Sequence, residues 1–268
     1  MSIPAKHVTA YPLIRLWLWS VAGLILAMVL IGGATRLTDS GLSITEWQPL
    51  MGVVPPLDEA SWKEAFEKYK AIPEYRIVNS GMSLAEFKFI YWWEWTHRFL
   101  GRFIGLVVFL PLAFLWATRR LDARTVRSMV LLLILGGAQG ALGWYMVKSG
   151  LAERTDVSQY RLAAHLALAA AIYATVVWIA LGIGTSFRRI DSREAGMALG
   201  LVLLILLQIA LGGLVAGLDA GLSHNTFPLM DGKLVPDGLL VMTPRWRNLF
   251  ENALTVQFLH RTMAYGVG

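Results

Sequence analysis

Three residues with chemically active side chains lie close together near the start of a long apolar stretch. Glu94 supplies a carboxylate, His97 an imidazole and Arg98 a guanidinium, directly after an aromatic run. Ionisable groups at the mouth of a membrane helix are unfavourable and are therefore a functional-site hypothesis by default. A second His-Arg pair, His260 and Arg261, opens another apolar stretch. We expect the two pairs to have related roles.

Three of the five histidines, His97, His165 and His260, are predicted to lie at one depth in the membrane. Each is a candidate hydrogen-bond partner between helices, but three at matched depth favour axial ligation of haem iron. Because cysteine is absent, haem fits this set better than zinc. We expect His97 and His165 to form one pair, and His260 to bind a second haem with a partner beyond the given sequence.

The arginines that follow two of these histidines, Arg98 and Arg261, suit a haem propionate. A guanidinium stays charged and binds carboxylates through two parallel hydrogen bonds. The alternative is that both side chains extend to the lipid headgroups. Arg36 and Arg102 are weaker candidates for the same contact.

Glu94 precedes His97 by three positions, so both side chains project from nearly one helix face. Near a porphyrin, this carboxylate could handle protons or stabilise a cationic intermediate. The alternative is a favourable charge at a helix N-terminus, contributing about 0.3–1 kcal/mol. The aligned residue near His260 is Gln257, which cannot ionise. We therefore expect the reaction to take place in the N-terminal half.

The composition is that of a polytopic helical membrane protein. Of 268 residues, 56% are hydrophobic and 16% are charged, whereas soluble domains have about 25% charged residues. Apolar runs predict membrane helices near residues 16–34, 93–117, 128–147, 162–184, 196–216 and from 249 onward. Segment 58–70 is amphipathic and is expected to lie on the membrane surface or to cap a pocket.

Basic residues indicate the orientation, because they concentrate on the cytoplasmic side. Arginines follow the second and fourth predicted helices, and the N-terminus is also basic. We therefore expect a cytoplasmic N-terminus, with the haem sites toward the opposite side of the membrane. The net charge of +6 belongs to cytoplasmic loops, so no nucleic-acid partner is expected.

The sequence also contains an internal repeat. At a constant offset, Gly32 aligns with Gly212 and Ser43 with Ser223, and His-Arg follows at the next helix in both copies. This predicts a parallel repeat of two four-helix halves. We expect an N-terminal half at 1–184, and the start of a C-terminal half at 185–268. Two further helices are expected to be missing from a truncated chain.

These stretches resemble the haem A synthase family, of the cysteine-free type of alphaproteobacteria and mitochondria. The matching segments are GGATRLTDSGLSITEWQPLMGVVPP, FIYWWEWTHRFLGR, GGAQGALGWYMVKSGL, YRLAAHLALA, GGLVAGLDAGLSHNTFPLMDG and QFLHRTMAYG. The resemblance implies eight helices in two bundles, and conversion of haem O to haem A by oxidation of a porphyrin methyl group to formyl. It also implies a substrate site in the N-terminal half and haem b in the C-terminal half.

Carried over to this sequence, the resemblance makes His97 and His165 the substrate-side pair, Glu94 the catalytic glutamate and His260 a haem b ligand. It further implies haem O as substrate, membrane lipid as surroundings, and haem O synthase and cytochrome oxidase assembly factors as partners. Histidine ligation alone leaves two alternatives open. These are a di-haem b cytochrome for electron transfer and a non-enzymatic haem carrier or assembly factor.

Overall fold

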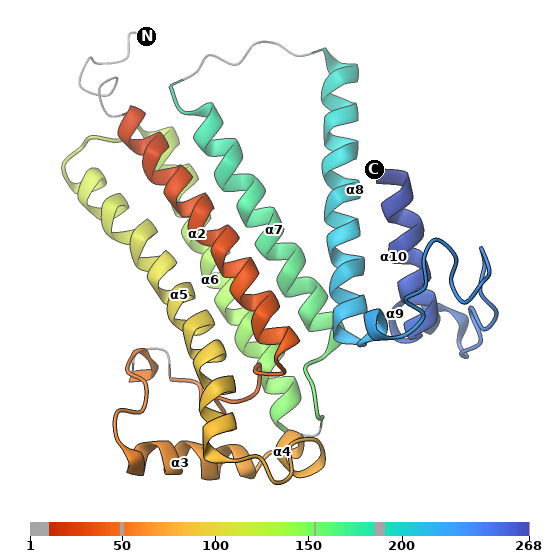
Figure 1. Ribbon diagram of the computed structural model, residues 1–268. Coiled ribbons are helices and arrows are strands. Elements are labelled where there is room, and N and C mark those ends of the chain that lie inside the picture. Colours follow the sequence, from red (N-terminus) through yellow and green to blue (C-terminus); the bar gives the residue numbers. More distant parts are fainter. Residues whose placement is uncertain (1–10, 49–50, 153, 185–190, 268) are drawn as a thin grey trace. The chain divides into compact units, whose positions relative to one another are not determined.

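The computed structural model describes residues 11–48, 51–152, 154–184 and 191–267, and the regular secondary structure of this part of the chain is helical apart from one isolated bridge (Figure 1). The elements are α2 (Tyr11–Leu37), η1 (Met51–Val53), α3 (Glu59–Lys70), α4 (Pro73–Ile77), α5 (Leu84–Ala117), α6 (Ala123–Ala152), α7 (Gln159–Gly182), α8 (Ser192–Gly217), η2 (Ala220–Leu222), η3 (Arg245–Arg247), α9 (Asn248–Glu251) and α10 (Ala253–Val267). Within the described residues, five helices are long and apolar enough to cross a membrane: α2, α5, α6, α7 and α8. The predicted all-α polytopic fold is confirmed.

The prediction that the second membrane helix begins near residue 93 is wrong. Helix α5 begins at Leu84, because Ser83 and Glu86 form a reciprocal capping box. The Ser83 hydroxyl accepts from the Glu86 backbone N–H at 3.3 Å, and the Ser83 N–H donates to the Glu86 carboxylate at 2.7 Å. Glu94 therefore lies in the helix interior and not at its mouth, which excludes stabilisation by the first turn of the helix.

The last predicted helix, from residue 249 onward, is interrupted. Helices α9 and α10 are separated by Asn252, whose backbone is extended at φ −89° and ψ 109°. The Asn252 side chain bonds to Asn248 at 3.0 Å and accepts from the Thr255 N–H at 3.1 Å. These hydrogen bonds stabilise the extended backbone that separates the two helices.

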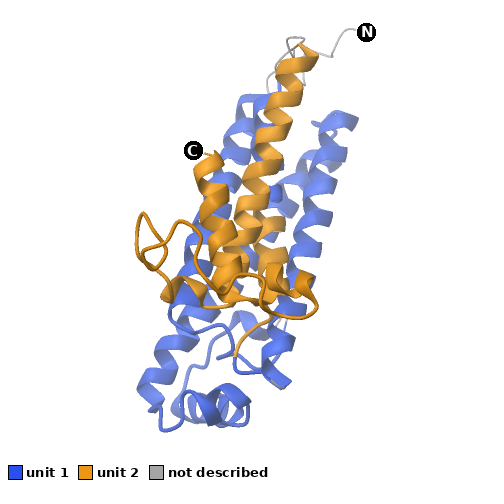
Figure 2. Cartoon of the chain, turned by 90° about the vertical axis from the view of Figure 1, so that its right-hand side faces the viewer, with its two compact units in different colours: residues 1–155, 171–188 blue, residues 156–170, 189–268 orange. Residues whose placement is uncertain are grey.

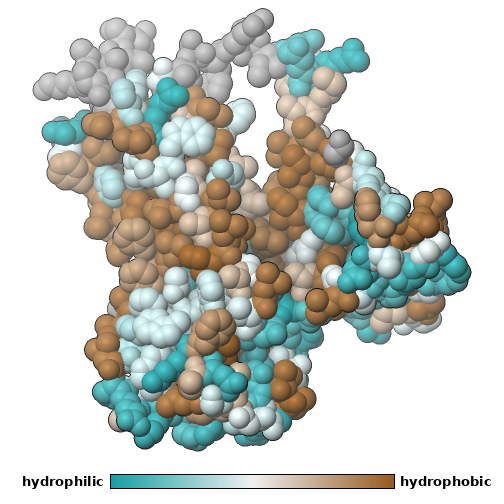
Figure 3. Space-filling view, in the orientation of Figure 1, coloured by the Kyte–Doolittle hydropathy of each residue, from teal (hydrophilic) through white to brown (hydrophobic). Residues whose placement is uncertain are grey.

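The chain divides into two compact units (Figure 2). Unit 1 comprises residues 1–155 and 171–188, and unit 2 comprises residues 156–170 and 189–268, so α7 contributes to both. Apolar side chains gather over the long helices of unit 1, and hydrophilic side chains are concentrated near α3 (Figure 3). The division into halves at residues 184 and 185 stays a prediction.

In unit 1, α3 lies across the N-terminal end of α5 (Figure 1). Its predicted apolar face is buried, as Trp62, Phe66 and Tyr69 show. Phe66 and Tyr69 both pack on Phe87 of α5, with ring centroids 4.9 and 5.2 Å apart. Burial of these rings on α5 fixes α3 and the loop that precedes it, and this loop reaches Glu94.

In unit 2, small residues bring the start of α7 against the end of α8. A Cβ atom on Gly213 would lie 2.7 Å from the Ala163 Cα, and one on Gly217 would lie 2.6 Å from the Gln159 Cα. Such contacts require glycine and allow two membrane helices to approach closely. Val256 of α10 completes this core and is fully buried.

Candidate functional site

Glu94 is the most enclosed of the predicted site residues, with 2% of its surface exposed. One carboxylate oxygen accepts from the Ser43 hydroxyl and from the Ile44 backbone N–H, both at 2.7 Å. The other accepts from Nε and Nη2 of Arg98 at 3.0 and 2.5 Å. A buried carboxylate needs such compensation, and here both oxygens have two donors. The bonds join α5 to the α2–α3 loop, which follows α2 at residue 38.

Arg98 also holds the loop itself. Its Nη2 donates to the Ile44 carbonyl at 2.8 Å, and its Nη1 donates to the Glu46 carbonyl at 3.1 Å. With the two bonds to Glu94, four hydrogen bonds leave one of the five guanidinium N–H groups for another ligand. The predicted propionate contact of Arg98 therefore remains a prediction, and the structure adds a role as an anchor of the loop.

Arg261 repeats this contact in unit 2. It donates to the carbonyl oxygens of His224 and Thr226 at 3.2 and 2.8 Å, and to Pro228 at 3.3 Å. In the alignment of the repeat, His224 corresponds to Ile44 and Thr226 to Glu46. The repeat read from the sequence is therefore also a repeat of side-chain to backbone hydrogen bonds.

The turn before each loop has the same backbone conformation in both units. Asp39 and Asp219, which align in the repeat, have φ values of 48° and 50°. A positive φ is uncommon outside glycine, and aspartate is among the residues that tolerate it. The aligned segments thus leave α2 and α8 in the same way.

Two of the predicted haem-binding histidines rest on glycines that also align in the repeat. A Cβ atom on Gly32 would lie 2.8 Å from Cε1 of His97, and one on Gly212 would lie 3.1 Å from Cε1 of His260. Both imidazoles are half-buried. The absence of a side chain on the facing helix leaves room for each ring.

The two units differ in the residue that precedes the histidine by three positions. Gln257 is buried, and its side-chain oxygen has no hydrogen bond within the described part of the chain. The Ser223 hydroxyl, which aligns with that of Ser43, bonds to the Ala220 carbonyl at 3.3 Å. The bonds that enclose Glu94 are thus not reproduced around Gln257.

His165 is half-buried in the first half of α7 and belongs to unit 2, whereas His97 belongs to unit 1. The pairing of these two histidines on one porphyrin stays a prediction. His260 and Arg261 lie in α10 of unit 2. The structure therefore brings together Glu94, His97 and Arg98 on one helix, and His260 and Arg261 on another.

Residues 15–268 match the family described as cytochrome oxidase assembly protein. The chain belongs to this family. A relative named haem A synthase, from Brucella ovis, is 56% identical over 256 residues, which cover 95% of this chain and 72% of that protein. The haem A synthase of Mesorhizobium japonicum is 55% identical over 256 residues, covering 95% of this chain and 70% of the relative. No solved structure gives a significant match.

The family to which this chain belongs includes haem A synthases, and membership therefore implies that the chain binds haem. The predicted site residues fit a haem group. No cluster of three or more histidines and carboxylates in the described residues is arranged to hold a bare metal ion. A porphyrin supplies four of the iron ligands itself and requires only axial imidazoles from the protein. The glycines opposite His97 and His260 leave each ring beside a surface without a side chain.

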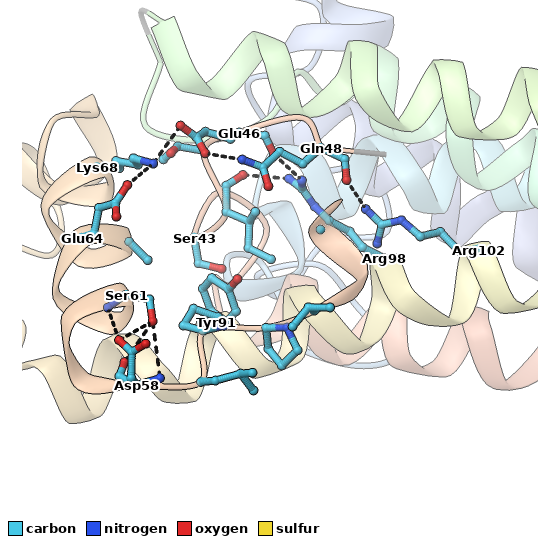
Figure 4. A pocket seen from close by; sticks show the side chains of 18 residues that line it. Ser43, Glu46, Gln48, Asp58, Ser61, Glu64, Lys68, Tyr91, Arg98 and Arg102 are labelled. Atoms are coloured by element: carbon cyan, nitrogen blue, oxygen red, sulfur yellow. Dashed lines mark hydrogen bonds and ion pairs between the residues drawn. The ribbon is translucent and has the colours of Figure 1, made fainter. Parts of the chain in front are cut away.

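Sequence reasoning missed the residues that hold Glu94 from outside α5. Ser43 and the Ile44 backbone N–H lie about 50 positions away in the chain. The available signal was the repeat, since Ser43 aligns with Ser223 in one of its best-matched stretches. A cavity of about 380 Å³ also lies beside these residues, between the α2–α3 loop, α3 and α5 (Figure 4).

Proposed function

We propose that this chain is a haem A synthase, a membrane oxidoreductase that converts haem O to haem A for cytochrome oxidase biogenesis. The reaction oxidises one porphyrin methyl group to formyl. The observation that carries this conclusion is the 56% identity over 95% of the chain with the haem A synthase of Brucella ovis. An electron-transfer cytochrome or a haem carrier fits less well, because neither needs a buried glutamate in one repeat and a glutamine in the other.

In this proposal, His97 and His165 would hold the substrate porphyrin, and His260 would be one of the residues that hold haem b. The second haem b ligand is assigned to no residue of this sequence. Support for the histidine roles comes from the glycines that face His97 and His260. Arg98 has one N–H group left for a propionate, and Arg261 has its Nε and one Nη1 N–H group left.

Glu94 is proposed as the catalytic residue. When bound, the porphyrin supplies the methyl carbon that is oxidised and the iron that the imidazoles bind. Glu94 projects near His97 and holds or moves a proton at its carboxylate oxygens, a role in which a positioned side chain contributes about 10²–10⁴-fold to the rate. Arg98 and Ser43 keep the carboxylate in one orientation, and the loop they hold covers it from water.

The proposed setting is the bacterial inner membrane, with the N-terminus in the cytoplasm and the haem sites toward the periplasm. Within it, residues 1–184 form the substrate half and residues 185–268 begin the haem b half. Haem O synthase would supply the substrate, and cytochrome oxidase assembly factors would receive the product. The five apolar helices support a membrane location.

The test is to produce the full-length protein in cells that make haem O and to extract the pigments. The expected product is a porphyrin with a formyl group, and hydroxymethyl porphyrin is the expected partial product. The proposal fails if neither is formed. His165→Ala should reduce the bound substrate porphyrin while haem b is retained, whereas equal loss of both pigments would contradict the division into two sites.

A further inference from the structure

The cavity beside Glu94 lies in unit 1, and its lining combines ionised and polar side chains with apolar ones such as Val54 and Leu57 (Figure 4). The α2–α3 loop provides one wall, α3 provides Ala65 and Lys68, and α5 provides Tyr91 and Arg98. Lys68 forms ion pairs across the wall with Glu46 at 3.0 Å and with Glu64 of α3 at 2.8 Å. The cavity of about 380 Å³ has room for on the order of ten water molecules at about 30 Å³ each, and the ionised groups in its wall offer them hydrogen-bond partners.

Only one layer of protein separates this cavity from Glu94. The carboxylate accepts hydrogen bonds from Ser43, Ile44 and Arg98, and each of these three residues also lines the cavity. Glu94 itself is buried and is not part of the lining. Among its donors, the Ser43 hydroxyl is the group that can both give and accept a proton at neutral pH.

We propose that the cavity is a water-filled antechamber through which Glu94 exchanges protons with the aqueous phase that bathes α3, with the Ser43 hydroxyl as the last relay. This inference rests on the catalytic role proposed for Glu94. Oxidation of a methyl group to formyl changes the number of hydrogens on carbon and oxygen, so protons must enter or leave a site that the membrane encloses. The antechamber gives those protons a path that does not cross the lipid.

The relay transfers one proton from Glu94 to the cavity and leaves both Glu94 and Ser43 in their starting states. A proton taken up at the Glu94 carboxylate passes to the Ser43 oxygen, while the hydroxyl proton of Ser43 passes to a water molecule in the cavity. Glu94 then carries its negative charge again, Ser43 is neutral, and rotation of the hydroxyl restores the observed bond at 2.7 Å. In unit 2, Gln257 cannot take up a proton and Ser223 bonds to Ala220, as expected if only one half releases protons.

The absence of cysteine allows a direct test with single introduced thiols. Ala65→Cys places a thiol in the cavity wall, and Ala60→Cys places one on an exposed position of the same helix as a matched control. A charged methanethiosulfonate reagent should modify both. Modification at residue 65 should slow haem A formation several-fold, and modification at residue 60 should leave it unchanged. Complete modification at residue 65 without loss of rate would overturn the proposal.

The relay is tested by Ser43→Ala against Ser40→Ala, which removes another fully buried hydroxyl of the same loop that does not contact Glu94. Loss of a proton relay should lower kcat by about tenfold or more and raise the solvent deuterium isotope effect, with KM unchanged. The Ser40 variant should keep the wild-type isotope effect. Equal isotope effects in both variants would show that Ser43 only supports the loop.

Hydroxyl-radical footprinting separates failure of the antechamber from failure of the proposed activity. The purified protein is irradiated whether or not it turns over, and oxidation of Tyr91 is compared with that of Phe87. Tyr91 lines the cavity, and Phe87 is a fully buried ring of the same helix. Water in the cavity should make Tyr91 several-fold more reactive, and modification of Ala65→Cys should abolish the difference. Equal oxidation of both rings would overturn the antechamber.

Discussion

The imidazole of His97 lies directly against Gly32, so that a Cβ atom on residue 32 would come within 2.8 Å of Cε1. Gly212 and His260 stand in the same relation at 3.1 Å. Two carbon atoms cannot stay this close, so in a variant with a Cβ atom at either glycine the facing imidazole ring would move. Each glycine therefore determines where its imidazole points.

Gly32→Ala and Gly212→Ala should each weaken haem binding in the half that carries the substitution. Overpacking of this kind typically destabilises a protein by about 1–3 kcal/mol. Here we expect the strain to be relieved mainly by displacement of the imidazole. The measurement is the amount of each pigment retained by the purified protein. Gly33→Ala and Gly200→Ala are matched controls, because a Cβ atom at either position has nothing within 4 Å. Pigment loss from the controls that equals the loss from the variants would contradict the account.

Arg98→Ala should destabilise the protein more than Arg261→Ala. Removing Arg98 leaves the Glu94 carboxylate, 3% exposed, without its cationic partner, which typically costs about 3–5 kcal/mol. Among the described residues, Arg261 bonds to three carbonyl oxygens, so its removal leaves no buried charge without a partner. Thermal unfolding in detergent measures the difference, and adding Glu94→Gln to Arg98→Ala should restore much of the loss. Equal unfolding temperatures of the two single variants would exclude this explanation.

Tyr69 should make stability depend on pH in the alkaline range. Burial, and then the charge of Glu74, raise the pKa of this phenol above its ordinary value, which is about 10. The stabilising contribution is fully present below that value. It is lost as the pH rises, because the unfolded chain releases the proton first. Tyr69→Phe should have a smaller loss of unfolding temperature between neutral and strongly alkaline pH than wild type, and parallel curves would refute the effect.

The fold was largely predictable because long apolar runs and the spacing of Trp62, Phe66 and Tyr69 reflect burial directly. The start of α5 was misplaced since residues 84–92 mix aromatic and charged side chains, and the apolar signal begins only afterwards. The capping pair Ser83 and Glu86 was the local signal that marks the true start.

The site was predictable only in part, for a physical reason. Glu94, His97 and Arg98 share one helix, so their spacing places them together. The contacts of Glu94 with Ser43 and Ile44 depend on how the α2–α3 loop folds over α5. The anchoring of that loop by Arg98 likewise joins residues about 50 positions apart, which no local pattern specifies.

Glu94→Gln tests the central claim, that the reaction takes place at the one repeat with an ionisable residue. The amide keeps the size of the side chain but cannot take up a proton, while Asp39→Asn controls for loss of a loop carboxylate that does not line the cavity. Pigments extracted from the full-length variant with haem O should contain haem b and unconverted haem O, with haem A lowered by about 10²–10⁴-fold. Haem A formation at the wild-type rate would contradict the assignment of catalysis to Glu94.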